Sequence, residues 1–124
     1  MQDRPDATEL LATVADFLER ELLPTLEGPA TYRTRVAVNL LKILEREQRL
    51  GPAARERECA LLRDLLGISD GVDPLELNRR LAAAIDAGEV SHEAAWPALM
   101  EIARGKLAIA RPGYDAYDSA NEQR

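Results

Sequence analysis

Glycine and proline residues divide this chain into segments whose apolar residues recur every three to four positions, the spacing of a helix with one buried face. The breaks fall at Pro24, Gly28, Gly51, Gly67 and Gly88. The alternation of period two that marks a strand is absent from the sequence. The spacing therefore predicts an all-α protein, an antiparallel bundle of about five helices with short connections.

The expected helices lie between these breaks, at residues 6–23, 30–50, 52–66, 73–87 and 97–110. Gly51 is expected to follow the second helix and Pro52 to begin the third, because glycine suits the position after a helix and proline the first position in one. Pro97 lies too deep for an uninterrupted helix, so a short turn at residues 92–95 is expected before the last helix.

Local sequence also predicts where helices begin and which faces they bury. Asp6 with Glu9 and Asp73 with Glu76 have the spacing of capping boxes, and Ser91 has the character of an N-cap. The apolar residues of the first two helices are expected to face the core, and they include Leu10, Val14, Phe17, Tyr32, Val36, Leu40 and Leu44.

The length of 124 residues suits one compact domain, which we expect to span residues 1–112, followed by a flexible polar tail at residues 113–124. Aromatic residues make up only 4% of the chain, so its core must be built mainly from leucine, alanine, valine and isoleucine. Leucine and alanine are strong helix formers, which agrees with the all-α prediction.

Charge and cysteine content exclude several classes of function. The net charge is −6, and arginines alternate with acids, so no basic patch for nucleic acid or an anionic membrane is present in the sequence. The apolar runs are too short to span a bilayer. The single cysteine, Cys59, and the absence of a signal-peptide pattern at the start predict a cytoplasmic protein.

Two glutamates interrupt the apolar faces of the two longest predicted helices. Glu21 lies between Val14 and Phe17 on the helical wheel, and Glu47 lies among the apolar residues of the next helix. A buried carboxylate needs a cation or hydrogen-bond donors, and the candidate partners are Arg35, Arg104 and Lys106. The functional interpretation is a shared acidic site; the structural one, which is favoured, is that both carboxylates reach solvent at the core's edge.

A polar strip on the second predicted helix offers a second lead. One edge of that helix carries Tyr32, Arg35, Asn39 and Arg46, and Arg35 could bind a ligand carboxylate or phosphate there. The alternative is an intramolecular network, and this too is favoured. No cofactor is expected because the phosphate-cradling and nucleophile motifs are absent, and no metal site because His92 is the only histidine.

The last helix suggests a surface for a protein partner. Trp96, Pro97, Leu99 and Met100 could form an exposed apolar patch, the kind of surface through which proteins associate. The leading hypothesis is therefore a non-catalytic interaction module that binds a partner enzyme or itself as a dimer. The alternative is a small ligand-binding protein or enzyme that uses Tyr32, Arg35, Asn39, Glu47, Glu21 and Lys106.

Several stretches taken together resemble an uncharacterised bacterial family of small domains of unknown function. They are the segments 4–11, 17–24, 35–39, 45–47, 106–107 and 112–114. Members of that family are found beside or fused to aminoglycoside-phosphotransferase-like kinases, often near acyl-CoA dehydrogenases. The resemblance implies an accessory role to a kinase-like or acyl-CoA enzyme, but no activity, since neighbourhood does not fix function.

Overall fold

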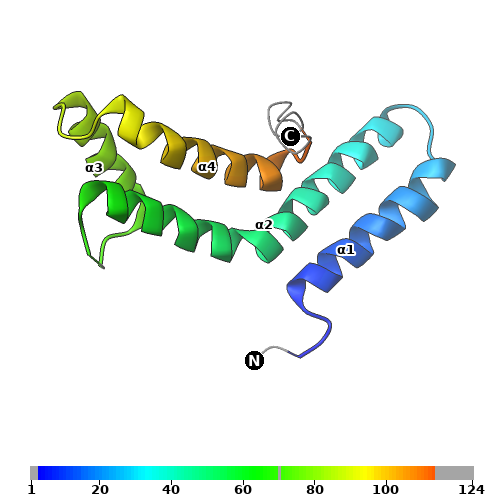
Figure 1. Cartoon of the computed structure of the whole chain (residues 1–124). Coiled ribbons are helices and arrows are strands. Elements are labelled where there is room, and N and C mark those ends of the chain that lie inside the picture. Colours follow the sequence, from blue (N-terminus) through cyan, green and yellow to red (C-terminus); the bar gives the residue numbers. More distant parts are fainter. Residues whose placement is uncertain (1–2, 70, 114–124) are drawn as a thin grey trace, which may run out of the picture. The chain divides into compact units, whose positions relative to one another are not determined.

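The described part of the protein is all-helical. The computed structural model describes residues 3–69 and 71–113, and the predicted tail lies outside them except for its first residue, Gly113. Among these residues are four α-helices (Figure 1): α1 (Ala7–Phe17), α2 (Pro29–Leu66), α3 (Pro74–Asp86) and α4 (His92–Ala110). None of the helices described is long and apolar enough to cross a membrane. The all-α prediction is confirmed, whereas the five-helix antiparallel bundle is not.

The chain divides into two compact units, and the division falls within α2. Unit 1 contains α1, the first part of α2 up to Gly51, and residues 109–111. Unit 2 contains the rest of α2 from Pro52, α3, and α4 up to Ala108.

The predicted break at Gly51 and Pro52 is wrong, because α2 runs through both residues. Gly51 is buried and keeps helical geometry instead of ending the helix with a positive φ. Proline within a helix removes one backbone hydrogen bond and strains the preceding turn, at a cost of about 3 kcal/mol. Leucine, arginine and alanine on both sides favour helix strongly enough for the helix to continue through that defect.

The predicted turn at residues 92–95 is also wrong, since α4 begins at His92 and contains Pro97. Ser91 is the N-cap that the sequence predicts: its hydroxyl oxygen accepts a hydrogen bond from the backbone N–H of Ala94 at 3.1 Å. Pro97 lies in the second turn of the helix, where it removes one backbone hydrogen bond and strains the preceding turn, as Pro52 does in α2. The helix therefore starts at its cap and passes through the proline.

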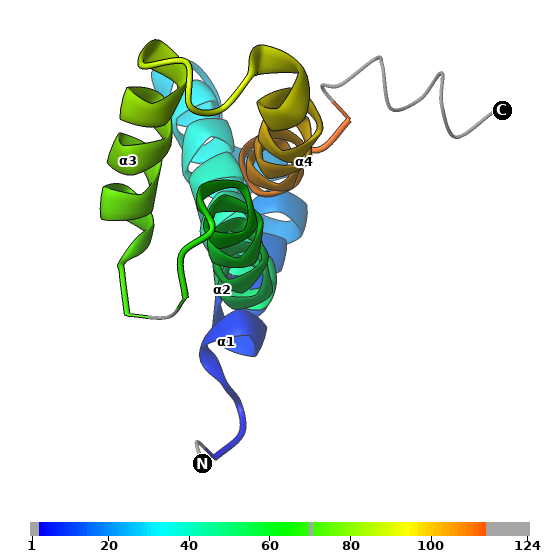
Figure 2. The same cartoon turned by 60° about the vertical axis from the view of Figure 1, so that its left-hand side comes forward.

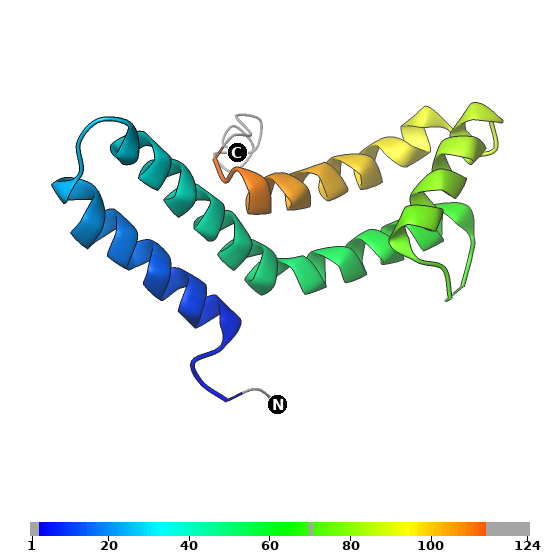
Figure 3. The same ribbon diagram turned by 180° about the vertical axis from the view of Figure 1, so that it is seen from behind.

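Unit 1 is a helical hairpin. The π-turn η1 (Leu18–Leu22) continues α1, and the 3₁₀ turn η2 (Leu23–Thr25) follows it. Gly28, at a φ of 67°, reverses the chain, and α2 then runs antiparallel to α1, as Figure 1 and the opposite view in Figure 3 show. Ala15 and Val38 are the buried side chains between these helices. Unit 1 therefore has only a thin core.

Unit 2 has the larger core. Leu62 and Leu77 are fully buried, and with Cys59 and Leu81 they form a cluster between α2 and α3. Figure 2 shows α3 and α4 on either side of this part of α2. Ile102 of α4 packs against the same cluster. Three helical segments thus surround one apolar centre.

The N-cap of α3 is the clearest local prediction that the structure confirms. A side-chain oxygen of Asp73 accepts a hydrogen bond from the backbone N–H of Glu76 at 2.9 Å, and Pro74 occupies the first helical position. Val72, just before the cap, packs against the same core cluster as Leu77, as a hydrophobic staple does.

Replacing Asp73 by alanine should therefore lower the free energy of unfolding by about 1 kcal/mol, because a backbone donor at the start of α3 loses its partner. Urea denaturation followed by circular dichroism measures this change. Asp86→Ala at the other end of α3 is the matched control. It should be neutral or slightly stabilising, because a carboxylate near a helix C-terminus opposes the helix dipole. Equal losses in the two variants would contradict the role of the cap.

Candidate functional site

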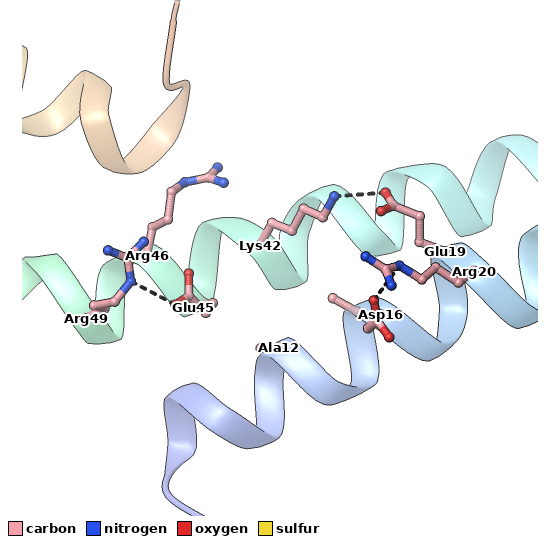
Figure 4. Close-up of a pocket in the computed structure, with 9 residues that line it drawn as sticks. Ala12, Asp16, Glu19, Arg20, Lys42, Glu45, Arg46 and Arg49 are labelled. Atoms are coloured by element: carbon pink, nitrogen blue, oxygen red, sulfur yellow. Dashed lines mark hydrogen bonds and ion pairs between the residues drawn. The ribbon is translucent and has the colours of Figure 1, made fainter.

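A charged groove runs between α1 and α2 within unit 1. Its volume is about 350 Å³, and Figure 4 shows the polar side chains of both helices along it. The π-turn η1 extends the side of α1, so that Glu19 and Arg20 also reach the groove. The charged residues that line it are Asp16, Glu19, Arg20, Lys42, Glu45, Arg46 and Arg49.

The charges in this groove are largely matched within the hairpin. Lys42 Nζ lies 2.8 Å from Glu19 Oε2 and so joins the two sides of the hairpin. Within single helices, two arginines pair with carboxylates one turn earlier: Arg20 with Asp16 at 2.8 Å, and Arg49 with Glu45 at 2.9 Å. These pairs are exposed for the most part, and such pairs contribute about 0–1 kcal/mol each. The groove is therefore a solvated seam that aligns the helices.

Arg46 connects this groove to the last turn of α4, and residues 109–111 belong to unit 1. Its Nε donates a hydrogen bond to the backbone carbonyl oxygen of Ile109 at 2.7 Å. That carbonyl belongs to the last turn of α4, where backbone acceptors have no partner within the helix. Arg46 thus caps the end of α4 with a cation, which the helix dipole favours.

Two of the predicted ligand residues share a neighbouring pocket. Arg35 and Asn39 line a cavity of about 300 Å³ in unit 1 together with Glu19 and Lys42. Arg35 and Asn39 are exposed, and Lys42 is already paired with Glu19. The pocket could hold a small anion between a guanidinium and an amide, the donors that suit a carboxylate or phosphate.

The other predicted ligand residues are not among those that line this pocket. Tyr32 is 71% exposed near the start of α2, and Glu21 is exposed in η1. Glu47 is half-buried on α2. Lys106 lies on α4 in unit 2, where its Nζ is 3.7 Å from a carboxylate oxygen of Glu58. The shared site of Glu21, Glu47, Arg35 and Lys106 remains a prediction.

Glu58 is a polar residue that the sequence did not single out. Only 12% of its side chain is exposed, and the same oxygen that faces Lys106 accepts a hydrogen bond from Asn78 Nδ2 at 3.1 Å. Asn78 also donates to the carbonyl oxygen of Pro74 at 2.7 Å. Glu58 therefore links α2 to both α3 and α4. Its tertiary partners are what set it apart, because its local sequence resembles any exposed arginine–glutamate run.

The predicted interface patch on α4 is partly exposed. Trp96 is 65% exposed and Leu99 38% exposed, while Met100 is half-buried. Trp96 and Pro97 border an open depression of about 420 Å³ with His92 and Glu93. The opposite face of the same turn carries the buried Ala95 and Ala98, so α4 packs through its small residues and leaves the indole outside.

The largest set of exposed apolar side chains lies on unit 1, where the sequence predicts a buried face. That prediction is wrong for the seven residues that follow, which are between 40% and 71% exposed: Leu10, Val14, Phe17, Tyr32, Val36, Leu40 and Leu44. The helices meet instead through positions such as Ala15 and Val38, so the larger apolar side chains of each helix stay exposed. Periodicity identifies an apolar face but not which element covers it.

Comparisons with known proteins identify the family. A family model described as a domain of unknown function, DUF6285, matches residues 24–114. No curated protein and no solved structure matches the chain. Because the matched segment covers well over half of the sequence, this chain belongs to the DUF6285 family of domains of unknown function.

Proposed function

We propose that this protein is a non-catalytic interaction module of the cytoplasm whose unit 1 docks onto another protein. The observation that carries the proposal is the exposed apolar surface of the α1–α2 hairpin. We define the docking surface by the three of those residues that share one face of α1: Leu10, Val14 and Phe17.

The exposed area matches the largest apolar patches of isolated soluble proteins. Three side chains of this size that are about half exposed together present roughly 300 Å² of apolar surface. A patch of about 300–600 Å² is the largest that a typical monomer shows, and such patches are often functional. The hairpin also lacks a core large enough to hold two helices in water, since helices gain most of their stability from packing. A partner that covers the docking surface would bury this apolar area and add the packing that the hairpin lacks.

Photo-crosslinking in cells tests this proposal. A benzophenone amino acid at Val14 should form discrete adducts heavier than the chain when the cells are irradiated. The matched control is the same amino acid at Leu75, which is also exposed, at 63%, but lies on α3 in unit 2. Adducts from Val14 and few from Leu75 are expected. The absence of adducts from Val14, or identical patterns from both positions, would overturn the proposal.

The partner class is suggested by the resemblance described above. Relatives beside or fused to kinase-like enzymes suggest that a separate copy acts as an accessory to a kinase-like or acyl-CoA enzyme. The masses of the Val14 adducts, identified by mass spectrometry, test that class.

A second candidate function is the binding of a small anionic ligand in unit 1. The observation in its favour is the pocket that Arg35 and Asn39 share with Lys42. A thermal-shift screen with phosphorylated compounds and acyl-CoA tests it, because a ligand that binds only the folded state raises its melting temperature. A shift in the wild type that Arg35→Ala abolishes would support this function, whereas no shift at millimolar ligand would exclude these compounds.

A further inference from the structure

The first turns of α4 leave an indole ring in water. Trp96 is 65% exposed, and it is the only tryptophan in the sequence. The buried residues of α4 are Ala95 and Ala98, so the helix packs within unit 2 without using the indole. Tryptophan offers a large rigid surface and is one of the commonest anchors of protein interfaces. Trp96 is therefore placed to contact a partner.

The indole borders a shallow depression that also carries a carboxylate. His92, Glu93, Trp96 and Pro97 line this depression of about 420 Å³, and we call these four residues the Trp96 surface. Side chains of a helix lean toward its N-terminus, which directs the indole toward the turn that holds His92 and Glu93. Glu93 is exposed and has no ion-pair partner among the residues that the structure describes. The surface thus combines an aromatic ring with an unpaired acid.

Charge along this part of the chain favours a cationic partner. Residues 81–103 contain four acids, Asp86, Glu89, Glu93 and Glu101, but neither lysine nor arginine. The start of a helix carries a partial positive charge of about half an elementary charge, which the full charge of Glu93 exceeds. A cation on the Trp96 surface is therefore attracted by its surroundings, whereas an acidic segment is repelled.

We propose that the Trp96 surface binds an arginine side chain of a partner protein, with the guanidinium stacked on the indole and hydrogen-bonded to Glu93. Tryptophan is the best of the aromatic rings for a cation. A planar guanidinium stacks on such a ring and donates two parallel hydrogen bonds to one carboxylate, whereas a lysine ammonium is compact and strongly hydrated. This contact lies in unit 2 and goes beyond the apolar docking of α1.

The fluorescence of the single tryptophan reports this contact directly. The probe is an acetylated and amidated peptide with two arginines separated by glycine, titrated to about 10 mM at about 150 mM salt. A saturable change in emission is expected. A citrulline peptide, which has the same shape without the charge, should give none, and a lysine peptide should bind at least about threefold more weakly. No saturable change with the arginine peptide, or equal Kd values for arginine and lysine peptides, would overturn the proposal.

Charge removal tests the role of Glu93. Glu93→Gln should raise the Kd of the arginine peptide about three- to fivefold, because the guanidinium loses its charged acceptor. Glu56→Gln makes the same change at an exposed glutamate of α2 in unit 2 and should alter the Kd less than about 1.5-fold. The same Kd in the two variants would show that Glu93 does not hold the arginine.

Substitutions of the indole test the stacking. Trp96→Leu keeps an apolar side chain but removes the aromatic face, and it should raise the Kd of the arginine peptide at least about fivefold. Trp96→Phe keeps an aromatic face and should raise the Kd less. Because both variants lack the fluorophore, the Kd is measured from NMR shifts of backbone amides in the first turns of α4. Equal losses for leucine and phenylalanine would contradict stacking on the ring.

A second copy of the chain is the rival occupant of the Trp96 surface. The emission of the wild type without peptide should not change with protein concentration between about 1 and 500 µM, a range that would reveal a micromolar dimer. A change that saturates with concentration would show that the indole is covered by another copy and would overturn the proposal. The crosslinking test at Val14 concerns unit 1, so the two proposals stand or fall separately.

Discussion

Replacing Leu62 by alanine is expected to lower the free energy of unfolding by about 2–5 kcal/mol, because Leu62 and Leu77 are the two largest fully buried side chains among the described residues. Leu62 has no exposed surface and belongs to the cluster that also holds Cys59, Leu77 and Leu81. Its removal forfeits the transfer of the side chain from water and leaves a cavity between α2 and α3 that the helices cannot close.

Urea denaturation followed by circular dichroism at 222 nm and by the fluorescence of Trp96 measures the effect. The matched control is Leu75→Ala, because Leu75 is 63% exposed in the same unit and its truncation should change stability by less than about 0.5 kcal/mol. A loss for Leu62→Ala no larger than for the control would show that this cluster is not the core of unit 2.

Backbone amides of α1 are expected to exchange with solvent at least about 100-fold faster than those of α2 around Leu62, under conditions where the chain is monomeric. Only Ala15 is buried in α1, whereas the segment around Leu62 lies in the main core. Local opening of α1 therefore exposes little additional apolar surface and costs little free energy.

Hydrogen exchange followed by NMR or mass spectrometry at low micromolar protein measures this difference. Amides of α3 near Leu77 and Leu81 serve as an internal reference, since these residues belong to the same core. Protection of α1 equal to that reference in the monomer would contradict the account of unit 1 as a hairpin with an incomplete core.

The features that sequence predicts well are those fixed by neighbouring residues. Asp6, Asp73 and Ser91 each accept a hydrogen bond from a backbone N–H three residues later, as their spacing predicts. Gly88, with a φ of 76°, follows α3 as expected. These contacts form within one turn of chain, so a local pattern contains all the information they need.

The sequence pattern does not predict features that depend on opposing helix propensities or on contacts between residues far apart in the chain. Pro52 disfavours a helix, but its neighbours favour one, and the sum decides for the continuous α2. The sequence offers Lys106 as a candidate cation for Glu21 or Glu47, but in the structure its Nζ lies near Glu58. The apolar pattern does not set Glu58 apart from the other exposed-looking glutamates. Only the packing of α2, α3 and α4 brings Glu58, Asn78 and Lys106 together.

The docking surface is a further feature that the sequence pattern identifies only in part. Leu10, Val14 and Phe17 were correctly placed on one face of a helix, but a single chain cannot reveal whether that face is covered by its own core or by a partner. In the structure Ala15 faces the hairpin contact while the larger residues remain exposed. The error in the predicted core is thus the evidence for the interaction surface.

Loss of crosslinking on a charge substitution tests the central claim most directly. In cells that carry the benzophenone amino acid at Leu10, Val14→Glu should reduce the adducts at least about tenfold, because it places a carboxylate in the middle of the apolar docking surface. Leu75→Glu makes the same charge change at an exposed leucine of α3 and should leave the adducts unchanged. Equal adduct yields in the two variants would contradict the claim that a partner covers this face of α1.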